Sequence, residues 1–395
     1  MSFNIANSGL NAVTEQLTSI SNNIANSGTV GYKSSRAEFS SIYAQSQPLG
    51  VSVSGVSQSI TRGGDISAGS SPLDLAISGN GFFVVRDSAG TTSYTRAGYF
   101  GFDKEGFIVN NNDMKIQGYP VDANGNLQVG TVSDLQVSTG SIPAKATDSL
   151  NFTANFDAEA TIPAKTPFDP ADRDSFNNSY TTQVFDSLGR EHTMTQYFVK
   201  TGENEWEAHY SVDGQTTGTP TTLQFDQNGV MIAPTGNVDI TTPVSGAQDL
   251  NISINYGGSS QFGSGFSVSN NASNGFASAE RTGVQIDKDG TVYATYSNGE
   301  RMLQGQLVLA NFTNANGLAP KDGTSWSQTS SSGNPIIGTP GSGLLGSVQS
   351  YALEGSNVDL TAELVNLMTA QRNYQANTKV ISTNDSMMQS LFQAI

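Results

Sequence analysis

Two short segments match the sequence motifs of known ligand-binding loops, but the residues around them do not match those motifs. The segment 341–346, GSGLLG, matches a dinucleotide-binding loop, which requires a strand before it and a helix after it. Pro340 precedes this segment and no helical pattern follows. The segment 287–290, DKDG, resembles part of a calcium loop, but Gln285 and Tyr296 stand at the first and last ligand positions, where carboxylates are needed. We therefore expect an ordinary glycine-rich loop and a turn.

The residues that usually carry acid, base or nucleophilic chemistry do not form a recognisable constellation. The chain has two histidines, His192 and His209, and neither has the neighbours of a hydrolytic triad. Strand alternation places His209 on an outward face, and we expect both histidines to be exposed or satisfied. No pair of carboxylates stands out as a general acid and base. The sequence therefore predicts no catalytic residue, no cofactor, no metal site and no enzyme activity.

Composition narrows the classes of partner. The chain has 395 residues and a formal net charge of −16, with 18 Lys and Arg residues that form no cluster. This argues against nucleic acid, whose phosphates require clustered cations, and against an anionic membrane surface. No apolar stretch approaches the roughly 20 residues that span a bilayer, and the first residues lack a secretory signal pattern. Cysteine is absent, so disulfides and thiolate chemistry are excluded.

Residues 3–27 predict a helix with a single apolar stripe. The stripe consists of Phe3, Ala6, Leu10, Val13, Leu17, Ile20 and Ile24. The segment carries one charged side chain, Glu15, whereas a free coiled coil would carry charges that set its register. Ordering about 25 residues costs roughly 1–2 kcal/mol each, which so small a stripe does not offset in a lone helix. We expect this helix to be frayed in the free subunit and to fold among other copies.

The segment 356–395 predicts a longer helix, because it contains no Gly and no Pro. Ser356 followed by Asp359 has the pattern of an N-terminal cap. Apolar residues recur seven apart, as in helices that pack side by side. They are Leu353, Leu360, Leu367, Tyr374, Ile381, Met388 and Ile395, and the alternate positions are Leu364, Gln371, Thr378, Asp385 and Phe392. The alternative is a helix lying on a β domain, although forty helical residues reach about 60 Å.

Between the helices the sequence predicts all-β, antiparallel structure. Six D-x-x-G turns begin at Asp87, Asp103, Asp122, Asp186, Asp226 and Asp287. In such turns Asp bonds its own backbone and Gly supplies the positive φ that closes a hairpin. Alternation over 206–212 places Trp206, Ala208, Tyr210 and Val212 on one face of a strand.

Shifts in composition suggest how the β segments are nested. We predict a mainly β, multidomain protein whose N- and C-terminal helical segments pack together in a coiled-coil-like manner. Residues 1–30 and 356–395 form the helical domain, and 31–70 form an extended connector. Residues 71–144 and 282–355 form an inner β domain, into which 145–281 is inserted as an outer β domain.

Both ends of the chain carry short, specific segments: NIAN at 23–26, TVGYK at 29–33, SNVDL at 356–360 and AQRNYQAN at 370–377. These segments resemble the terminal signatures of the bacterial flagellar rod, hook and hook-associated proteins. The segment 73–83 is similar to one found in distal rod and hook members. The signature residues of the family stand here at Asn23, Asn26, Gly31, Tyr32, Lys33, Asn357, Asp359, Gln371, Arg372 and Tyr374.

The long middle favours the hook branch of this family. Distal rod members are similar at their ends but have a much shorter centre. The segments 165–168, 182–189 and 204–206 resemble the outer domain of hook members. The alternatives are a distal rod-type axial protein, a surface adhesin or carbohydrate-binding β protein with a helical stalk, and a wall-cleaving enzyme.

The resemblance implies a homopolymer, a curved flexible tube that acts as a universal joint, transmits torque from rod to filament and provides the export channel. Subunits would leave through the flagellar type III export apparatus without a cleaved signal and reside in the hook outside the cell. Implied partners are the distal rod protein, the hook cap, the hook-length control protein and the hook–filament junction protein. The predicted self-assembly residues are Phe3, Leu10, Val13, Leu17, Ile20, Ile24, Leu360, Leu364, Leu367, Tyr374, Ile381 and Met388.

Overall fold

A computed structural model describes residues 2–44, 47–122 and 125–393. The chain folds into two compact units. Unit 1 comprises the described residues of 1–139, 283–295 and 301–395, and unit 2 comprises 140–282 and 296–300. The predicted fold class is confirmed, since β structure lies between terminal helices. The segment 145–281, predicted as an outer domain, falls within unit 2. The predicted helical segments fall in unit 1, together with the predicted inner β segments except 140–144, 282 and 296–300, which belong to unit 2.

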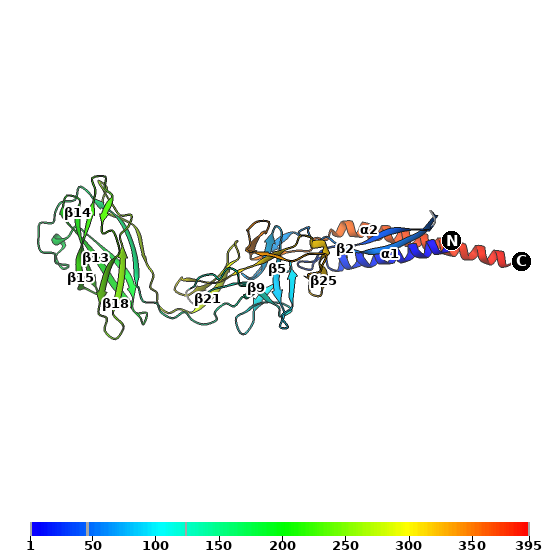
Figure 1. Ribbon diagram of the computed structural model, residues 1–395, viewed down its shortest axis with the longest axis horizontal. Helices are drawn as coiled ribbons and strands as arrows, with labels where there is room; N and C mark the ends of the chain where they lie inside the picture. Colours follow the sequence, from blue (N-terminus) through cyan, green and yellow to red (C-terminus); the bar gives the residue numbers. More distant parts are fainter. Residues whose placement is uncertain (1, 45–46, 123–124, 394–395) are drawn as a thin grey trace. The chain divides into compact units, whose positions relative to one another are not determined.

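Two helices, α1 (Ser2–Ala25) and α2 (Leu360–Gln393), lie side by side in unit 1, as Figure 1 shows. Asp359 caps α2, because its Oδ1 accepts hydrogen bonds from the N–H groups of Thr361 (3.0 Å) and Ala362 (3.1 Å). The predicted cap at Ser356 is therefore one turn too early. Ile395 and the side chain of Phe392 lie outside the described residues.

The segment after α1 forms a long antiparallel hairpin. Its strands are β1 (Ser35–Ala44) and β2 (Gln47–Gln58). The hairpin contacts α1, where the Val51 N–H donates to Ser8 Oγ at 3.2 Å. We predicted only an extended connector over 31–70. The alternation of Val51 and Val53 with serines is a strand pattern that indicates the hairpin, since every second side chain faces the same way.

The β part of unit 1 is built on a 13-stranded sheet. Its central order is β21-β22-β23-β9-β5-β6-β26-β25. These strands are β21 (Arg281–Ile286), β22 (Thr291–Tyr296), β23 (Arg301–Leu307), β9 (Lys115–Pro120), β5 (Phe82–Arg86), β6 (Thr92–Thr95), β26 (Ser325–Ser327) and β25 (Ala319–Lys321). The remaining strands pair beside this path: β7 (Phe100–Phe102), β8 (Ile108–Asn110), β10 (Ser133–Asp134), β24 (Leu309–Asn311) and β27 (Ile336–Gly338).

Two short strand pairs join the beginning and the end of the chain in unit 1. Strand β3 (Ile66–Ala68) pairs with β29 (Ala352–Glu354), and β4 (Leu75–Ser78) pairs with β28 (Ser347–Ser350). A 3-10 turn, η2, covers Ala315–Gly317. The aromatic core of the sheet contains Phe82, Tyr94, Phe312 and Trp326, which meet edge to face. The segment 341–346 connects β27 to β28 as the expected glycine-rich loop, so a strand and not a helix follows it directly.

Unit 2 consists of two five-stranded sheets. One has the order β17-β18-β11-β19 with β20 also paired to β11, and the other has the order β12-β13-β14-β15-β16. The first contains β11 (Ser149–Asp157), β17 (Val238–Thr242), β18 (Leu250–Asn255), β19 (Ser260–Phe262) and β20 (Ser267–Ser273). The second contains β12 (Asn178–Phe185), β13 (Glu191–Gly202), β14 (Glu205–Val212), β15 (Gln215–Phe225) and β16 (Met231–Ala233), with η1 (Arg173–Ser175) before it.

The two sheets of unit 2 share one apolar core. Phe152 and Phe156 of β11 meet Phe198 of β13 and Trp206 of β14. The predicted inward face over 206–212 is confirmed, because its four apolar side chains are all in this core. The expectation that the middle is antiparallel is wrong at β11, which pairs in parallel with β18 and β19. Two parallel strands that pair must be joined by a long connection. Such a pairing leaves no short-range sequence pattern from which it could be predicted.

The D-x-x-G turns are confirmed in all six places. In each, the Gly N–H donates to the Asp carbonyl at 2.9–3.2 Å, and the Gly has a φ between +78° and +86°. At the turn that starts at Asp226, Oδ1 also accepts from the N–H groups of Asn228 and Val230. The Asp carboxylate thus holds the turn while Gly supplies a conformation that L side chains rarely adopt.

His192 joins one of these turns to a neighbouring hairpin. Its Nε2 lies 3.4 Å from Oδ2 of the buried Asp186, and its Nδ1 lies 2.6 Å from Oδ2 of Asp213. Arg190 Nε also donates to Asp186 Oδ2 at 2.7 Å. The hydrogen bond to Asp213 raises the pKa of His192. Burial acts to lower this pKa, and the hydrogen bond to Asp186 acts to raise it further. The expectation of a satisfied histidine is confirmed for His192.

His209 lies opposite the core on β14, as predicted, but it is covered. The Phe168 ring stacks on its imidazole with 4.1 Å between ring centroids. Its Nε2 lies 3.3 Å from Oε2 of Glu207. Burial lowers the pKa of His209, and Glu207 offsets this only in part.

We predict that His192 stabilises unit 2 more at acidic pH. Because its pKa is higher in the folded chain, the stabilisation is complete below the unfolded value of about 6.5 and is lost as pH rises through the folded value. The loss of unfolding free energy caused by His192→Gln should therefore be larger at about pH 5.5 than at about pH 8.5. Denaturant titration followed by Trp206 fluorescence in a Trp326→Phe background measures it.

His209→Gln is the matched control with the opposite sign. Because the folded pKa of His209 is lowered, its contribution should shrink as pH falls. Equal pH dependence of the two variants would contradict the assigned ion pairs.

Candidate functional site

The two helices bury a small apolar seam between them. Its members come from both ends of the chain: Val13, Leu17, Ile20, Ile24, Leu367 and Ala370. Val13, Ile20 and Ala370 are buried, and the others are partly buried. Further along, Gly9 faces Asn377, and a Cβ on Gly9 would lie 3.0–3.2 Å from the Asn377 amide group. The lack of a side chain at Gly9 therefore allows a close helix–helix approach.

The other predicted self-assembly residues lie outside this seam. Phe3, Leu360, Leu364, Tyr374 and Met388 are 42–49% exposed, and Leu10 and Ile381 are half-buried. Of the seven-residue row, Leu367 packs in the seam within the subunit, and a role of the other members in self-assembly stays a prediction. Met388 lies 18 residues after Ala370, which is five full helical turns, so it is on the same side of α2 as the buried Ala370. It is exposed because α2 continues beyond the start of α1 (Figure 1).

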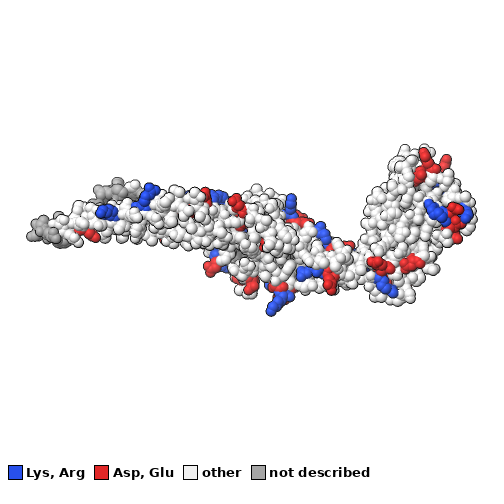
Figure 2. Space-filling model, turned by 180° about the vertical axis from the view of Figure 1, so that it is seen from behind, with Lys and Arg blue, Asp and Glu red and all other residues white. Residues whose placement is uncertain are grey.

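Further large apolar side chains are exposed on α2, on more than one side of the helix. Exposed there, besides the residues above, are Val365, Met368, Val380 and Met387. The hairpin also exposes Phe39, Ile42, Tyr43, Val53 and Val56. On the face drawn in Figure 2, charged side chains are sparse over the helical end of unit 1. We call the exposed apolar residues of α2 the outward stripe. Soluble surfaces seldom leave so many large apolar side chains together unless they bind something.

Asn23 joins α1, β1 and α2 at one point. Its Nδ2 donates to the Ser35 carbonyl at 2.7 Å and to Glu363 Oε1 at 3.0 Å. Its Oδ1 accepts from the Ser35 N–H at 2.9 Å and from the Tyr32 hydroxyl at 3.2 Å. Asn23 is buried, so its polar atoms must be paired to avoid a desolvation cost. The signature residues Asn23 and Tyr32 thus position the start of the hairpin against both helices.

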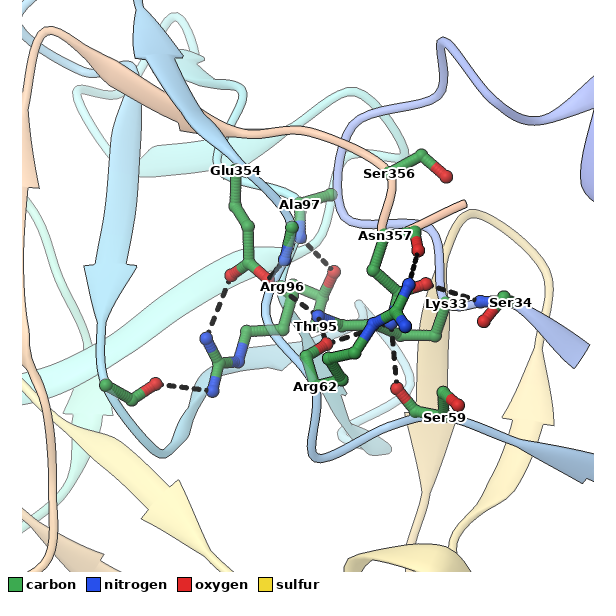
Figure 3. A network of polar contacts seen from close by, with 12 residues as sticks. Lys33, Ser34, Ser59, Arg62, Thr95, Arg96, Ala97, Glu354, Ser356 and Asn357 are labelled. Atoms are coloured by element: carbon green, nitrogen blue, oxygen red, sulfur yellow. Dashed lines mark hydrogen bonds and ion pairs between the residues drawn. The ribbon is translucent and has the colours of Figure 1, made fainter. Parts of the chain in front are cut away.

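A buried ion network lies where both helices meet the β part of unit 1 (Figure 3). Glu354 Oε1 lies 2.6 Å from Lys33 Nζ, and Oε2 lies 2.8 Å from Arg96 Nη1. Lys33 also donates to the Arg62 carbonyl at 2.8 Å, and Gly64 N–H donates to Glu354 Oε1 at 3.0 Å. The side chains of Lys33 and Glu354 are at most 1% exposed. Segments from three distant parts of the sequence are therefore held by one carboxylate.

The charges of this network depend on one another. Burial acts to raise the pKa of Glu354, but the neighbouring charges of Arg96 and Lys33 outweigh it and hold the pKa below its usual range. Burial lowers the pKa of Lys33, and Glu354 offsets this in part. Glu354 is therefore ionised at neutral pH and needs its cations.

Asn357 extends the same network toward α2. Its Oδ1 accepts from the Ser34 N–H at 2.7 Å, and its Nδ2 donates to the carbonyls of Ser59 (3.0 Å) and Arg62 (2.9 Å). Arg62 in turn donates to the Asn357 carbonyl. Asn357 thus fixes the residues just before α2 to both sides of the hairpin.

Gly31 is required by its backbone and its surroundings. It has a φ of +74°, and a Cβ there would lie 2.5 Å from the Ala97 nitrogen. Its N–H donates to the Glu354 carbonyl at 2.8 Å. Asn26 closes the turn after α1, since its Oδ1 accepts from Thr29 Oγ1 at 3.1 Å. These signature residues bend the chain from α1 into the hairpin.

The remaining signature residues lie on the exposed surface of α2. Gln371, Arg372 and Tyr374 are exposed, and the Arg372 guanidinium reaches only Thr369 Oγ1, at 3.5 Å, among the contacts seen for the described chain. They therefore contribute little to the fold of the subunit.

Sequence reasoning missed Arg96, Glu354 and Glu363. Lys33 and Glu354 are separated by 321 residues, so no local spacing indicates their pairing. A scarce charge flanked by apolar residues, as in Ala352-Leu-Glu354, is the one signal that was present, because an unpaired charge is rarely buried.

Four family models match segments of this chain. They describe a flagella basal body rod protein (residues 3–33), a flagellar hook protein FlgE/F/G D1 domain (76–163), a flagellar basal body protein FlaE D2 domain (151–276) and a flagellar basal body rod FlgEFG protein C-terminal region (349–394). The flagellar hook protein FlgE of Salmonella typhimurium is 41% identical to this chain over 409 residues and covers 99% of both chains. The chain belongs to the flagellar hook protein FlgE family.

Other FlgE relatives agree with this assignment. The flagellar hook protein FlgE of Escherichia coli K12 is 39% identical, with 99% of both chains covered, and that of Borreliella burgdorferi is 30% identical, with 97% of both covered. The predicted family and its hook branch are confirmed.

A solved structure shares the fold. The Helicobacter pylori flagellar hook protein FlgE2 superposes with a TM-score of 0.54 at 13% identity, and the match covers 72% of this chain and 99% of that chain. This likeness supports the mainly β architecture between terminal helices.

We predict that Glu354→Gln destabilises unit 1 by about 3–5 kcal/mol, because it leaves Lys33 and Arg96 buried without an anion. Denaturant unfolding followed by Trp326 fluorescence in a Trp206→Phe background measures unit 1, since Trp326 is the buried tryptophan of that unit.

Glu38→Gln is the matched control. Glu38 pairs with Arg36 at 2.7 Å, but these side chains are 44% and 79% exposed, and exposed pairs contribute little. We expect no measurable change from Glu38→Gln. An equally small effect of Glu354→Gln would contradict the structural role given to the network.

Proposed function

We propose that the chain is the structural subunit of a flagellar hook that polymerises with itself through its terminal helices. The observation that carries this proposal is the outward stripe of α2. Its large apolar side chains contact neither α1 nor a β strand closely enough to be buried. Full burial of each is worth roughly 1.5–3 kcal/mol, so contacts among copies of α2 would supply a substantial driving force.

The charge distribution supports an inner position for the helices in that polymer. Helix α1 contains one ionisable side chain, Glu15. Burying an unpaired charge among other copies would cost several kcal/mol, and so few charges keep that cost small. The predicted self-assembly residues then act at two levels. The α1–α2 seam orders the subunit, and the outward stripe joins subunits into a tube.

The β part of unit 1 and the whole of unit 2 would form the outer part of the tube and allow it to bend. Their surfaces are rich in Ser, Thr, Asn and Gly. Small, wet contacts between such surfaces can exchange partners at low cost, as a universal joint requires while it transmits torque. The tube would also enclose the channel through which later subunits are exported.

The chain's further partners are proposed from its family alone. They are the flagellar type III export apparatus, the distal rod protein, the hook cap, the hook-length control protein and the hook–filament junction protein. The subunit would reside outside the cell in the hook, with no nucleic acid partner. Neither helix, over the residues described, is long and apolar enough to cross a membrane. We propose that the role is structural and involves no catalysis or cofactor.

We predict that Leu364→Asp prevents polymerisation while the subunit stays folded. Leu364 lies outside the α1–α2 seam and is 45% exposed, so a charge there costs little until another copy covers it. Sedimentation and electron microscopy measure the polymer, and circular dichroism measures the fold of the subunit.

Leu364→Met is the matched control and should polymerise normally, because it keeps an apolar side chain of similar volume. Leu367→Asp should instead reduce helicity in the subunit, because Leu367 packs in the seam. Normal tubes from the Leu364→Asp subunit would exclude the outward stripe as the assembly surface.

A further inference from the structure

Three methionines are exposed on the assembly helix. Met368, Met387 and Met388 are 55%, 61% and 49% exposed. Each belongs to an apolar row of α2. Met368 follows Leu364 by one turn, Met387 follows Val380 by seven residues, and Met388 follows Ile381 by seven residues.

Other methionines of the chain provide a contrast. Met114 and Met194 are 9% and 0% exposed in the cores of units 1 and 2. Met302 is 39% exposed and lies on strand β23 of the sheet, not on a helix. The thioethers most open to a dissolved reagent, among the residues described, are therefore those on α2.

The exposed thioethers can react with a peroxide. The sulfur lone pair attacks one peroxide oxygen, an S–O bond forms as the O–O bond breaks, and water leaves after proton transfer. The sulfur is oxidised by two electrons and the peroxide is reduced by two. The product, methionine sulfoxide, is a polar and chiral side chain that packs poorly in an apolar interface.

We propose that Met368, Met387 and Met388 are an oxidation-sensitive modification site that controls whether the subunit can polymerise. This inference rests on the proposed function, in which the outward stripe becomes buried between copies. Reduced methionines complete the stripe, whereas their sulfoxides place polar S–O groups where apolar contact is needed. Because packing among copies covers the sulfurs, assembled subunits are protected and free subunits are sensitive.

The test treats the full chain with hydrogen peroxide, either as free subunits or as polymer, and locates each 16 Da mass increase on peptides. In free subunits, Met368, Met387, Met388 and Met302 should be oxidised well before Met114 and Met194. In the polymer, the oxidation rates of the three methionines of α2 should be lower than in the free subunit by a factor of about ten or more. Unchanged rates on α2 would overturn the proposal.

Polymerisation of the treated subunits tests the consequence. Peroxide-treated wild-type subunits should need on the order of tenfold higher concentration to polymerise. The variant Met368→Leu/Met387→Leu/Met388→Leu keeps the stripe apolar, and its polymerisation should be insensitive to the same treatment. Equal loss of assembly in both proteins, or no loss in wild type, would overturn the modification site. Failure of untreated wild-type subunits to polymerise would instead overturn the proposed function itself, and this inference with it.

Discussion

The carboxylate of Glu354 is the interaction on which the arrangement of unit 1 depends. Its two oxygens lie against Lys33 and Arg96, and the carbonyl of the same residue accepts the N–H of Gly31. The chain leaving α1, the β sheet and the chain entering α2 therefore meet at one buried anion (Figure 3). Separating any of them would leave a charge in a medium of low dielectric, which is far more costly than losing a surface ion pair.

This junction allows the helix pair to be held with little apolar contact. The seam of Val13, Ile20 and Ala370 is small, and polar contacts of Asn23 and Asn357 supplement it. Large side chains of α2 are thereby left outside the subunit instead of being used to fold it. A subunit that satisfied its whole apolar surface internally would have little reason to associate. The chain itself supplies α1 with a partner, so this account predicts an ordered α1 in the free subunit, in place of the expectation that it folds only among other copies.

Local features were predictable from sequence and distant pairings were not. Each D-x-x-G turn is specified by an Asp and a Gly three positions apart, so the pattern alone gives its geometry. The helices followed from their apolar spacing and from the absence of Gly and Pro in α2. The pairing of Lys33 with Glu354 spans 321 residues and leaves no periodic signal. The seven-residue spacing did not predict which residues of α2 contact α1. Spacing identifies the apolar residues of a helix, but not which of them face a given neighbouring element.

The central claim is that the subunit buries one face of its helix pair and leaves the other for further copies. Hydrogen–deuterium exchange of the backbone, compared between free subunits and polymer, tests it most directly. The account predicts that amides around Val13 and Ala370 are protected in both states. Amides of α2 from Val380 to Met388 should become strongly protected only in the polymer. Slow exchange throughout α2 in the free subunit, unchanged by polymerisation, would contradict the account.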